Sequence, residues 1–445
     1  MPRDKPLGLL ALLRVLAKNP LEAWTQAHFE QPIVMGGLSI GRVALVSDPV
    51  AIRRVLMDNT QNYQKDWLTR RVLSAGLNNG LLTAEGQQWK MQRRALAPLF
   101  ARRTVTSFSA GMVEAAAGLV ERLKKRDGEI TDIAVEVTRV TLEVLERTMF
   151  SDGLGRNTEE IRVAMKHYFD AIGKLDLFDV LGLPAAVPRL SRWKVRPMLR
   201  LFDSAIDAIV ATRRRRLAQE PDAVPRDILT LLLEARDPES DEALSEVEVR
   251  ANILTFIVAG HETTANTIAW TLFLLSQSPE WRSRVQAEAD RELDGDIGGL
   301  AERLVETRAV IDETIRLYPP LAAISRAARG PDELAGQPIR RGTMVVIAPY
   351  VLHRHRALWG DPDCFDPSRF LGSARERIDR FAYLPFGVGP RVCIGAALAL
   401  QEAAIVVASV MRSFTVELAP GHAVWPMHRV TVRPHGGLPM IARRR

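Results

Sequence analysis

Hydrophobic positions follow three different patterns along the chain. Residues 32–47 alternate apolar side chains with Gly and Ser, which predicts a hairpin of two strands. From residue 49 to about 235 the apolar positions recur at helical spacing. Two stretches interrupt the helices as predicted loops, near Thr69–Leu82 and Leu181–Pro188. The C-terminal third adds short strands, expected at Met344–Ile347, Thr415–Leu418 and Val430–Arg433. The pattern predicts a mainly α fold with small β-sheets.

One predicted helix is much longer than the others. Ser245 and Glu248 form an S-x-x-E capping box, and an apolar pattern continues to about Ser276 before Pro279 ends it. We expect a helix over 245–277, of which the apolar part from Val247 to about Ser276 would be roughly 45 Å long. It is apolar nearly all round, so we expect it to be buried. A buried helix of this length favours one domain spanning residues 1–445, and no repeat or low-complexity linker divides the chain.

The first 30 residues form a separate, amphipathic segment. Its apolar stretch from Leu7 to Leu13 is interrupted by Arg14 and Lys18, well short of the ~20 residues that a membrane span requires. We expect a short helix packed on the protein, no transmembrane anchor and a cytoplasmic location. A signal peptide is disfavoured because no small-x-small cleavage site follows, and loose surface contact with a membrane stays open.

Composition and charge narrow the possible functions. The 445 residues are 47% hydrophobic and 25% charged, as in a soluble globular protein. Cys364 and Cys393, the two cysteines, provide no disulfide framework or C-x-x-C zinc motif, which favours a reducing compartment. The net charge of +7 favours an acidic partner, either nucleic acid or a redox protein. Without a nucleic-acid-binding motif we expect no nucleic-acid partner, and the runs Arg213–Arg216 and Arg443–Arg445 are interpreted as solvated faces.

The middle of the long helix carries polar residues that an apolar core does not favour. The sequence there is Ala259-Gly260-His261-Glu262-Thr263-Thr264. A glycine inside a helix costs about 1 kcal/mol, and a buried acid with paired threonines needs compensation. One interpretation is a kink satisfied by buried water. The other is a helix opened locally beside a ligand, with hydroxyl and carboxyl groups ready to pass protons.

A second motif surrounds one of the cysteines. The segment Phe386-Gly387-Val388-Gly389-Pro390-Arg391-Val392-Cys393-Ile394-Gly395 predicts a tight loop that leads into a helix rich in small residues. A helix N-terminus stabilises a thiolate, and small residues after it would let a flat cofactor approach the backbone. A lone cysteine is more often an inert small hydrophobe. The flanking loop favours a ligand here.

These two motifs resemble those of the cytochrome P-450 family. The family's cysteine loop is F-x-x-G-x-R-x-C-x-G and its distal-helix motif is A-G-x-[DE]-T-T, and both are intact here. The resemblance implies a triangular helical prism with the long helix over a haem b, and Cys393 as axial ligand of the haem iron. It implies that Thr263 and Glu262 are catalytic through proton delivery to dioxygen. It also places these residues around the haem: Ala259, Gly260, Phe386, Gly387, Arg391 and Gly395.

Two further pairs match the family in order and spacing. Glu313 and Arg316, with Arg369, resemble a buried ion network of structural role. Trp89 and Arg93 are separated by one helical turn, and the resemblance assigns them, with Arg391 and Arg326, to the haem propionates. Guanidinium groups suit carboxylates because they bind them in a bidentate way. We do not expect His353 or His355, on a predicted strand-to-loop segment, to bind the iron.

The function implied is a monooxygenase that inserts one oxygen atom from O₂ into a hydrophobic substrate, by hydroxylation or epoxidation. Electrons are expected from a separate ferredoxin or flavodoxin with its reductase, and the protein is expected to be a monomer. Two alternatives stay open: a peroxide-driven peroxygenase or haem-thiolate isomerase, which typically lacks the acid–threonine pair, and a non-catalytic haem sensor or carrier.

The resemblance also predicts where substrate and partner bind. Substrate contacts are expected from the stretches Thr69–Leu82, Tyr168–Leu190, Leu321–Ile324 and Met427–Val430. The acidic redox protein is expected to bind a cluster of arginines on the side of the haem where the cysteine lies, namely Arg93, Arg94, Arg102, Arg103 and Arg391.

Overall fold

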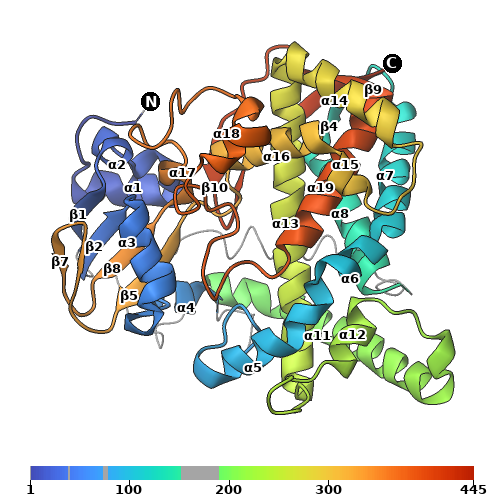
Figure 1. Cartoon of the computed structure of the whole chain (residues 1–445), viewed down its shortest axis with the longest axis horizontal. Helices are drawn as coiled ribbons and strands as arrows, with labels where there is room; N and C mark the ends of the chain where they lie inside the picture. The colour runs from blue at the N-terminus through green and yellow to red at the C-terminus, as the bar shows by residue number, and fades with distance from the viewer. Residues whose placement is uncertain (1, 39–40, 74–78, 152–189) are drawn as a thin grey trace.

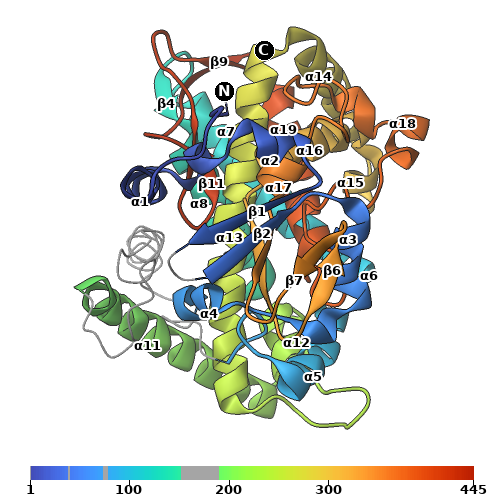
Figure 2. The ribbon, with the colours of Figure 1, turned by 90° about the vertical axis from the view of Figure 1, so that its left-hand side faces the viewer.

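Helices form most of the molecule, and a small sheet lies at one side of them. The computed structural model describes residues 2–38, 41–73, 79–151 and 190–445. In Figure 1 the sheet lies on the left, the helices fill the right, and helix α13 runs vertically through the helical part. Figure 2 shows the same helix passing behind the sheet strands β1 and β2. The predicted fold class, mainly α with small sheets, is confirmed.

The helices and strands have the following bounds. The helices are α1 (Leu9–Lys18), α2 (Gln26–Glu30), α3 (Pro49–Arg53), α4 (Trp67–Leu73), α5 (Gly86–Leu96), α6 (Arg102–Ser107), α7 (Ser109–Lys124), α8 (Ile133–Met149), α11 (Leu190–Gln219), α12 (Ile228–Glu234), α13 (Glu246–Gln277), α14 (Pro279–Glu292), α15 (Leu300–Arg303), α16 (Val305–Leu317), α17 (Pro349–Leu352), α18 (Gly372–Glu376) and α19 (Ala396–Ser413). The strands are β1 (Ile33–Leu38), β2 (Gly41–Val46), β3 (Tyr63–Gln64), β4 (Ile130–Asp132), β5 (Ile324–Ala328), β6 (Asp332–Leu334), β7 (Gln337–Ile339), β8 (Met344–Ile347), β9 (Phe414–Leu418), β10 (Pro426–His428), β11 (Val432–Pro434) and β12 (Pro439–Arg444).

Helix α13 confirms the prediction of a long buried helix. Its 32 residues extend about 48 Å, and the capping box at Ser245 and Glu248 has both of its hydrogen bonds. Residues on every side of α13 are buried. The helix packs against α8, α19, α16 and α11, so the core of the helical part is built around it.

The polar motif in α13 does not interrupt the helix. Residues 259–264 remain α-helical. The threonine hydroxyls donate hydrogen bonds to carbonyls of the same helix. Thr263 Oγ1 donates to Ala259 O at 2.9 Å, and Thr264 Oγ1 donates to Gly260 O at 3.0 Å. Because these bonds remove the cost of burying a hydroxyl, the core can hold paired threonines without a break.

The five-stranded sheet combines strands from the N-terminal part of the chain with two strands from its C-terminal third. The predicted hairpin is confirmed as β1 and β2, which pair antiparallel with Ile33 opposite Val46. The sheet order is β1-β2-β8-β5-β3, with β2 and β8 parallel. The strand predicted at Met344–Ile347 is β8, with the same bounds. This pairing places the N-terminal hairpin beside the segment that follows Pro319 and Pro320.

Helix α19 begins shortly after Cys393 and enters the core. Within the described ranges it is the one helix long and apolar enough to cross a membrane, by length and composition only, and 61% of it is buried inside the protein. It packs against α7, α14 and α13. Burial by three other helices explains its apolar composition.

Other expectations have mixed outcomes. The amphipathic helix predicted near the N-terminus is confirmed as α1. The loop predicted at Thr69–Leu82 is wrong in its first part, because α4 covers Trp67–Leu73. Asp66 caps this helix by accepting hydrogen bonds from the backbone amides of Leu68 and Thr69. The interpretation of Arg213 as a solvated residue is also wrong: it is 2% exposed and paired with Asp227, Nη2 to Oδ2 at 2.8 Å.

Candidate active site

The cysteine loop is closed by its own backbone and by a neighbouring segment. The Cys393 amide donates to Phe386 O at 2.9 Å, which ties the two ends of the loop together. Gly387 and Gly389 have φ angles of 72° and 77°, a conformation that favours glycine. A Cβ on Gly389 would also lie 2.0 Å from Leu56 O. The loop therefore needs glycine at this position for both its conformation and its close packing.

The sulfur of Cys393 faces an interior space. Burial raises the pKa of the Cys393 thiol, whereas a hydrogen bond from the Gly395 backbone and the charge of Arg93 lower it. Yet the residue keeps an exposed surface. Both observations are consistent if the thiol lies deep among protein atoms and opens onto an internal cavity. The N-terminus of α19, which begins at Ala396, supplies further stabilisation for a thiolate.

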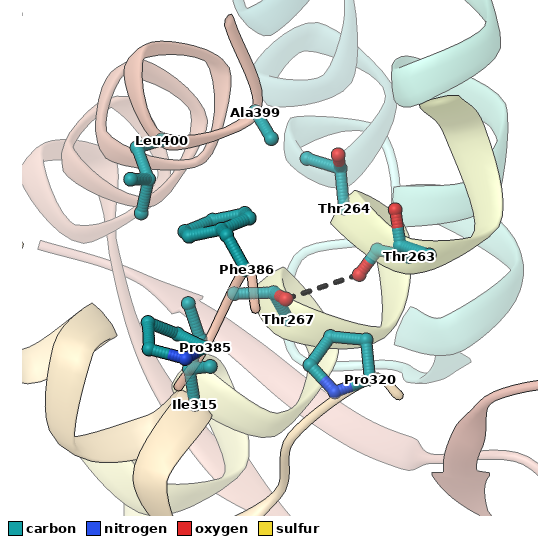
Figure 3. Close-up of a pocket in the computed structure, with 9 residues that line it drawn as sticks. All are labelled: Thr263, Thr264, Thr267, Ile315, Pro320, Pro385, Phe386, Ala399 and Leu400. Atoms are coloured by element: carbon teal, nitrogen blue, oxygen red, sulfur yellow. Dashed lines mark hydrogen bonds between the residues drawn. The ribbon is translucent and has the colours of Figure 1, made fainter. Parts of the chain in front are cut away.

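Helix α13 forms the wall opposite the cysteine loop. Ala259 is exposed although its neighbours Val258 and His261 are buried, so it too faces internal space. A pocket lies between α13, the cysteine loop and the start of α19, as Figure 3 shows. It is lined by Thr263, Thr264, Thr267, Ile315, Pro320, Pro385, Phe386, Ala399 and Leu400. Gly260 instead lies against α8, where an added Cβ would meet Leu145 Cδ1 at 3.3 Å.

Glu262 is held from outside α13. Its Oε1 atom accepts a hydrogen bond at 2.9 Å from Thr431 Oγ1, which lies in the turn between β10 and β11. This turn overlaps the stretch Met427–Val430, predicted to contact substrate. Leu321, in another predicted stretch, is 50% exposed. Of the remaining stretches, residues 74–78 and 168–189 lie outside the described residues.

A group of cations lies beside the cysteine loop. Arg391 stacks on Trp89, with its Cζ atom 4.3 Å from the ring centroid. Its guanidinium donates to Ala84 O at 3.2 Å and to Glu85 Oε2 at 2.6 Å. Lys65 donates to the same Ala84 carbonyl at 3.3 Å and lies 3.7 Å from Glu85 Oε1. Two cations thus share one carboxylate and one carbonyl.

The environment of these cations disfavours positive charge. Burial first, then the charges of Arg391 and Arg326, lower the pKa of Lys65 to about 8, with Glu85 opposing. Burial and the charge of Arg391 also lower the pKa of Arg326. Burial is the main cause that lowers the pKa of Arg391. Cations that repel one another in a desolvated place would be stabilised by an added anion.

Four residues of this region were predicted from the sequence, and Lys65 was not. Trp89, Arg391 and Arg326 were predicted, and Arg93 lies one turn after Trp89 on α5, near enough to Cys393 for the two charges to interact. Lys65 was not predicted, since no motif surrounds it. Its position before the helix-capping Asp66 was the only available signal.

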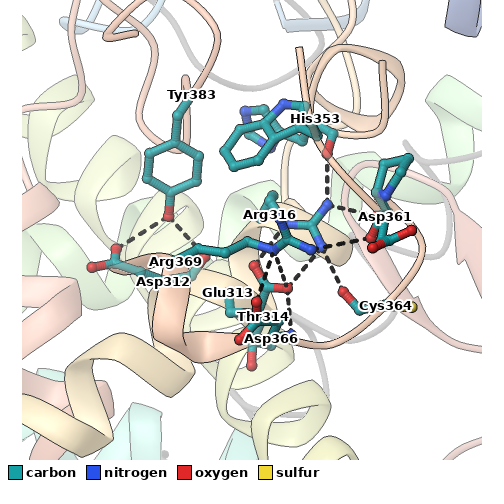
Figure 4. A network of polar contacts seen from close by, with 12 residues as sticks. Asp312, Glu313, Thr314, Arg316, His353, Asp361, Cys364, Asp366, Arg369 and Tyr383 are labelled. Carbon is teal, nitrogen blue, oxygen red and sulfur yellow. Dashed lines mark hydrogen bonds and ion pairs between the residues drawn. The ribbon is translucent and has the colours of Figure 1, made fainter. Parts of the chain in front are cut away.

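Glu313, Arg316 and Arg369 come together in a second charged group, drawn in Figure 4. Arg316 is fully buried and binds both oxygens of Glu313, at 2.6 and 2.7 Å. Its remaining N–H groups donate to backbone carbonyls of His353, Pro362 and Cys364 at 2.7–2.9 Å. Arg369 Nε lies 3.7 Å from Glu313 Oε1. The arrangement joins α16 to the segment that precedes the cysteine loop.

The two histidines considered as iron ligands are engaged elsewhere. His353 Nε2 accepts the amide of Leu384 at 2.8 Å, and burial lowers its pKa to about 3. His355 Nε2 lies 3.1 Å from Gln31 O. The strand-to-loop prediction for this segment is wrong, since α17 covers Pro349–Leu352 and His353 caps its C-terminus.

A family model described as Cytochrome P450 matches residues 2–438. The chain belongs to the cytochrome P450 family. A cyclooctat-9-en-7-ol 5-monooxygenase of Streptomyces melanosporofaciens is 32% identical, over 93% of this chain and 88% of the relative. Putative cytochrome P450 132 of Mycobacterium tuberculosis is 33% identical over 91% of this chain and 88% of the relative.

Solved structures agree with this assignment. The haem domain of cytochrome P450DA is 25% identical, and its crystal structure superposes with a TM-score of 0.84 over 100% of this chain and 97% of that one. The predicted family and its fold are therefore confirmed. The chain is an enzyme, a P450 monooxygenase among the oxidoreductases. The family implies a haem-thiolate cofactor.

The residues present fit such a cofactor. The Cys393 thiol lies deep among protein atoms and yet keeps an exposed surface, and cations whose pKa values are lowered lie beside the cysteine loop. A haem has an iron for the first feature and two carboxylates for the second.

Proposed function

We propose that this P450 inserts one oxygen atom from O₂ into a hydrophobic organic substrate, by hydroxylation or epoxidation. The observation that carries the proposal is the shared pocket: Phe386 of the cysteine loop and the threonines of α13 line the same space. A thiolate-bound cofactor and a source of protons would thus act on one substrate from opposite walls.

The cofactor that we propose is haem b, with Cys393 as the axial ligand of its iron. Lys65, Arg93, Arg326 and Arg391 would hold the two propionates, and Trp89 would support Arg391 by stacking. Phe386, Gly387 and Gly395 would border the ring on the cysteine side, and Ala259 on the other. When bound, the haem supplies dioxygen binding and oxidising power, tuned by the thiolate.

Thr263 and Glu262 would control protons in the pocket. The Thr263 hydroxyl donates its hydrogen bond to Ala259 O. Toward the pocket it can therefore act as an acceptor and fix the orientation of a proton donor there. Glu262, the preceding residue, would take protons from the outer side of α13 and pass them on through water. General acid–base groups typically contribute about 10²–10⁴-fold to rate.

The electron donor that we propose is an acidic ferredoxin or flavodoxin with its reductase. Of the five arginines expected to attract it, Arg391 is paired with Glu85, and Arg94 is paired with Asp237 and Glu239. Arg102 is paired with Glu302, while Arg103 and Lys90 are exposed. The docking face is therefore better sought around α6 and the exposed side of α5. We further propose a cytoplasmic monomer, with residues 1–445 as one domain.

The absorption spectrum of the reduced, carbon-monoxide-bound protein tests the proposal. The wild type should show a thiolate-type spectrum, and Cys393→Ala should lose it, whereas the control Cys364→Ala should keep it. A thiolate-type spectrum that survives in Cys393→Ala would sink the proposal. Turnover should require both the reduced partner and O₂; full turnover with peroxide alone would instead favour a peroxygenase.

A further inference from the structure

One face of α13 is attached to the turn that joins β10 and β11. Glu262, Asn266 and Trp270 follow one another at intervals of four residues, so they form a stripe along the helix. Trp270 Nε1 donates to Val432 O at 3.2 Å. Asn266 Nδ2 donates to Thr431 Oγ1 at 2.9 Å, and Thr431 Oγ1 donates to Glu262 Oε1 at 2.9 Å. The stripe thus holds Thr431, the last residue of the turn, and Val432, the first residue of β11.

The direction of these hydrogen bonds is fixed by the chemistry of the groups. A threonine hydroxyl has one proton to donate and lone pairs to accept. Because the Asn266 amide donates to Thr431 Oγ1, the single hydroxyl proton of Thr431 is directed at Glu262. Asn266 and Thr431 are 8% and 4% exposed, so water competes little for either bond. The chain of donors therefore ends on the Glu262 carboxyl group.

Thr431 is itself held in place. The Val432 amide donates to Pro320 O at 3.0 Å, and Pro320 lines the pocket. The Arg429 amide donates to Thr431 O at 3.1 Å, which closes the turn. The hydroxyl that reaches Glu262 thus belongs to a backbone anchored on both sides, and contacts between α13 and β11 reinforce it, as the two lie side by side in Figure 2.

We propose that Thr431 and Asn266 are positioning residues for Glu262: Thr431 sets the orientation of the carboxyl group, and Asn266 sets the direction of the Thr431 hydroxyl. This inference rests on the proposed role of Glu262 in proton delivery. It assigns a second task to the β10–β11 turn, which had been expected only to contact substrate. Neither residue touches the reacting atoms. We therefore expect them to affect the fraction of consumed electrons that is recovered in product.

The test compares the fraction of electrons recovered in product for matched variants. Thr431→Val keeps the shape of the side chain and removes the donor, whereas Thr431→Ser keeps the donor. Asn266→Asp replaces the amide by an acceptor, which should turn the Thr431 hydroxyl away from Glu262. We expect Thr431→Val and Asn266→Asp to lower the recovered fraction about tenfold, as for loss of one hydrogen bond to a charged group, and Thr431→Ser to restore it to near the wild-type value.

Two further measurements separate this inference from the function on which it rests. Glu262→Gln should lower the recovered fraction at least as much as Thr431→Val, and adding Thr431→Val to Glu262→Gln should change nothing more. If Glu262→Gln has no effect, the proposed role of Glu262 fails. If Glu262→Gln acts and Thr431→Val does not, only the positioning role fails. A crystal structure of Thr431→Val should show the Glu262 side chain in a new orientation, and an unchanged one would overturn the inference.

Discussion

The Glu313–Arg316 pair and the cations around Arg391 are both desolvated, but the first is a pair of opposite charges and the second gathers several cations around one carboxylate. Arg316 uses its N–H groups on both oxygens of Glu313 and on three backbone carbonyls. Lys65 and Arg391 instead share Glu85, and burial and repulsion from neighbouring cations lower the pKa of Lys65. A buried pair of opposite charges is structural, whereas an excess of buried cations over carboxylates favours an anionic ligand.

The largest effect on the unfolding free energy is expected at the Glu313–Arg316 pair, where the two charges balance. Arg316→Met should leave the Glu313 carboxyl group buried without its partner, and burial already raises the pKa of that carboxyl. Losing one partner of a buried pair costs about 3–5 kcal/mol. Urea unfolding of the apoprotein would measure this loss. Arg316→Met with Glu313→Leu should recover part of it, and equal stability of the single variant and the wild type would contradict the comparison.

Removal of a cation near Arg391 should weaken haem binding and should not lower the stability of the apoprotein. Arg391→Met should speed haem loss about 10- to 100-fold, because it removes a charge-assisted hydrogen bond to a propionate. The unfolding free energy of the apoprotein should stay the same or rise, since one repelling buried charge is gone. Transfer of haem to apomyoglobin measures the first quantity and urea unfolding the second. Glu85→Gln is the matched control, expected to keep haem bound but to destabilise the apoprotein.

Acid should destabilise the region around Arg316 through His353. Burial lowers the pKa of His353 from 6.5 to about 3 in the folded protein. Between these pH values the unfolded chain binds a proton that the folded chain does not, so stability falls as the pH falls from 6.5 toward 3. At pH 5.5 the loss should be about 1 kcal/mol. His353→Gln should lose less stability than the wild type between pH 7 and pH 5.5 in urea unfolding. Parallel losses would refute the assignment.

The smallest effect is expected for exposed cations, where water screens the charge. Arg103→Glu should slow electron transfer from an acidic donor about threefold at low ionic strength, and the difference should vanish at high salt. Stopped-flow reduction would measure the rates. The control is Arg340→Glu, which should leave the rate unchanged. Arg340 follows strand β7, which lies on the sheet side of the molecule. An equal effect of both reversals would argue against a docking face near α6.

Local patterns predicted some elements well and others poorly. The hairpin of β1 and β2, the capped start of α13 and strand β8 follow from spacing within a few residues. Helix α4 was not predicted, because its polar residues obscure the helical pattern and its start depends on the cap supplied by Asp66. Helix α13 continues through its polar motif because the threonine hydroxyls donate hydrogen bonds to backbone carbonyls of the same helix, which a hydropathy pattern does not reveal.

The sequence by itself determined the long central helix, the glycine-bearing cysteine loop and the pairing of Glu313 with Arg316, because each depends on residues close together in the chain. Only the tertiary structure decided that Lys65 lies beside Arg391, that Thr431 reaches Glu262, and that Arg213 is buried. Lys65–Arg391 and Thr431–Glu262 join segments that are far apart in the chain, 169 residues in the case of Thr431 and Glu262. The burial of Arg213 depends on which helix face meets the core. Packing, not local periodicity, sets such distances and the desolvation that gives these charges their roles.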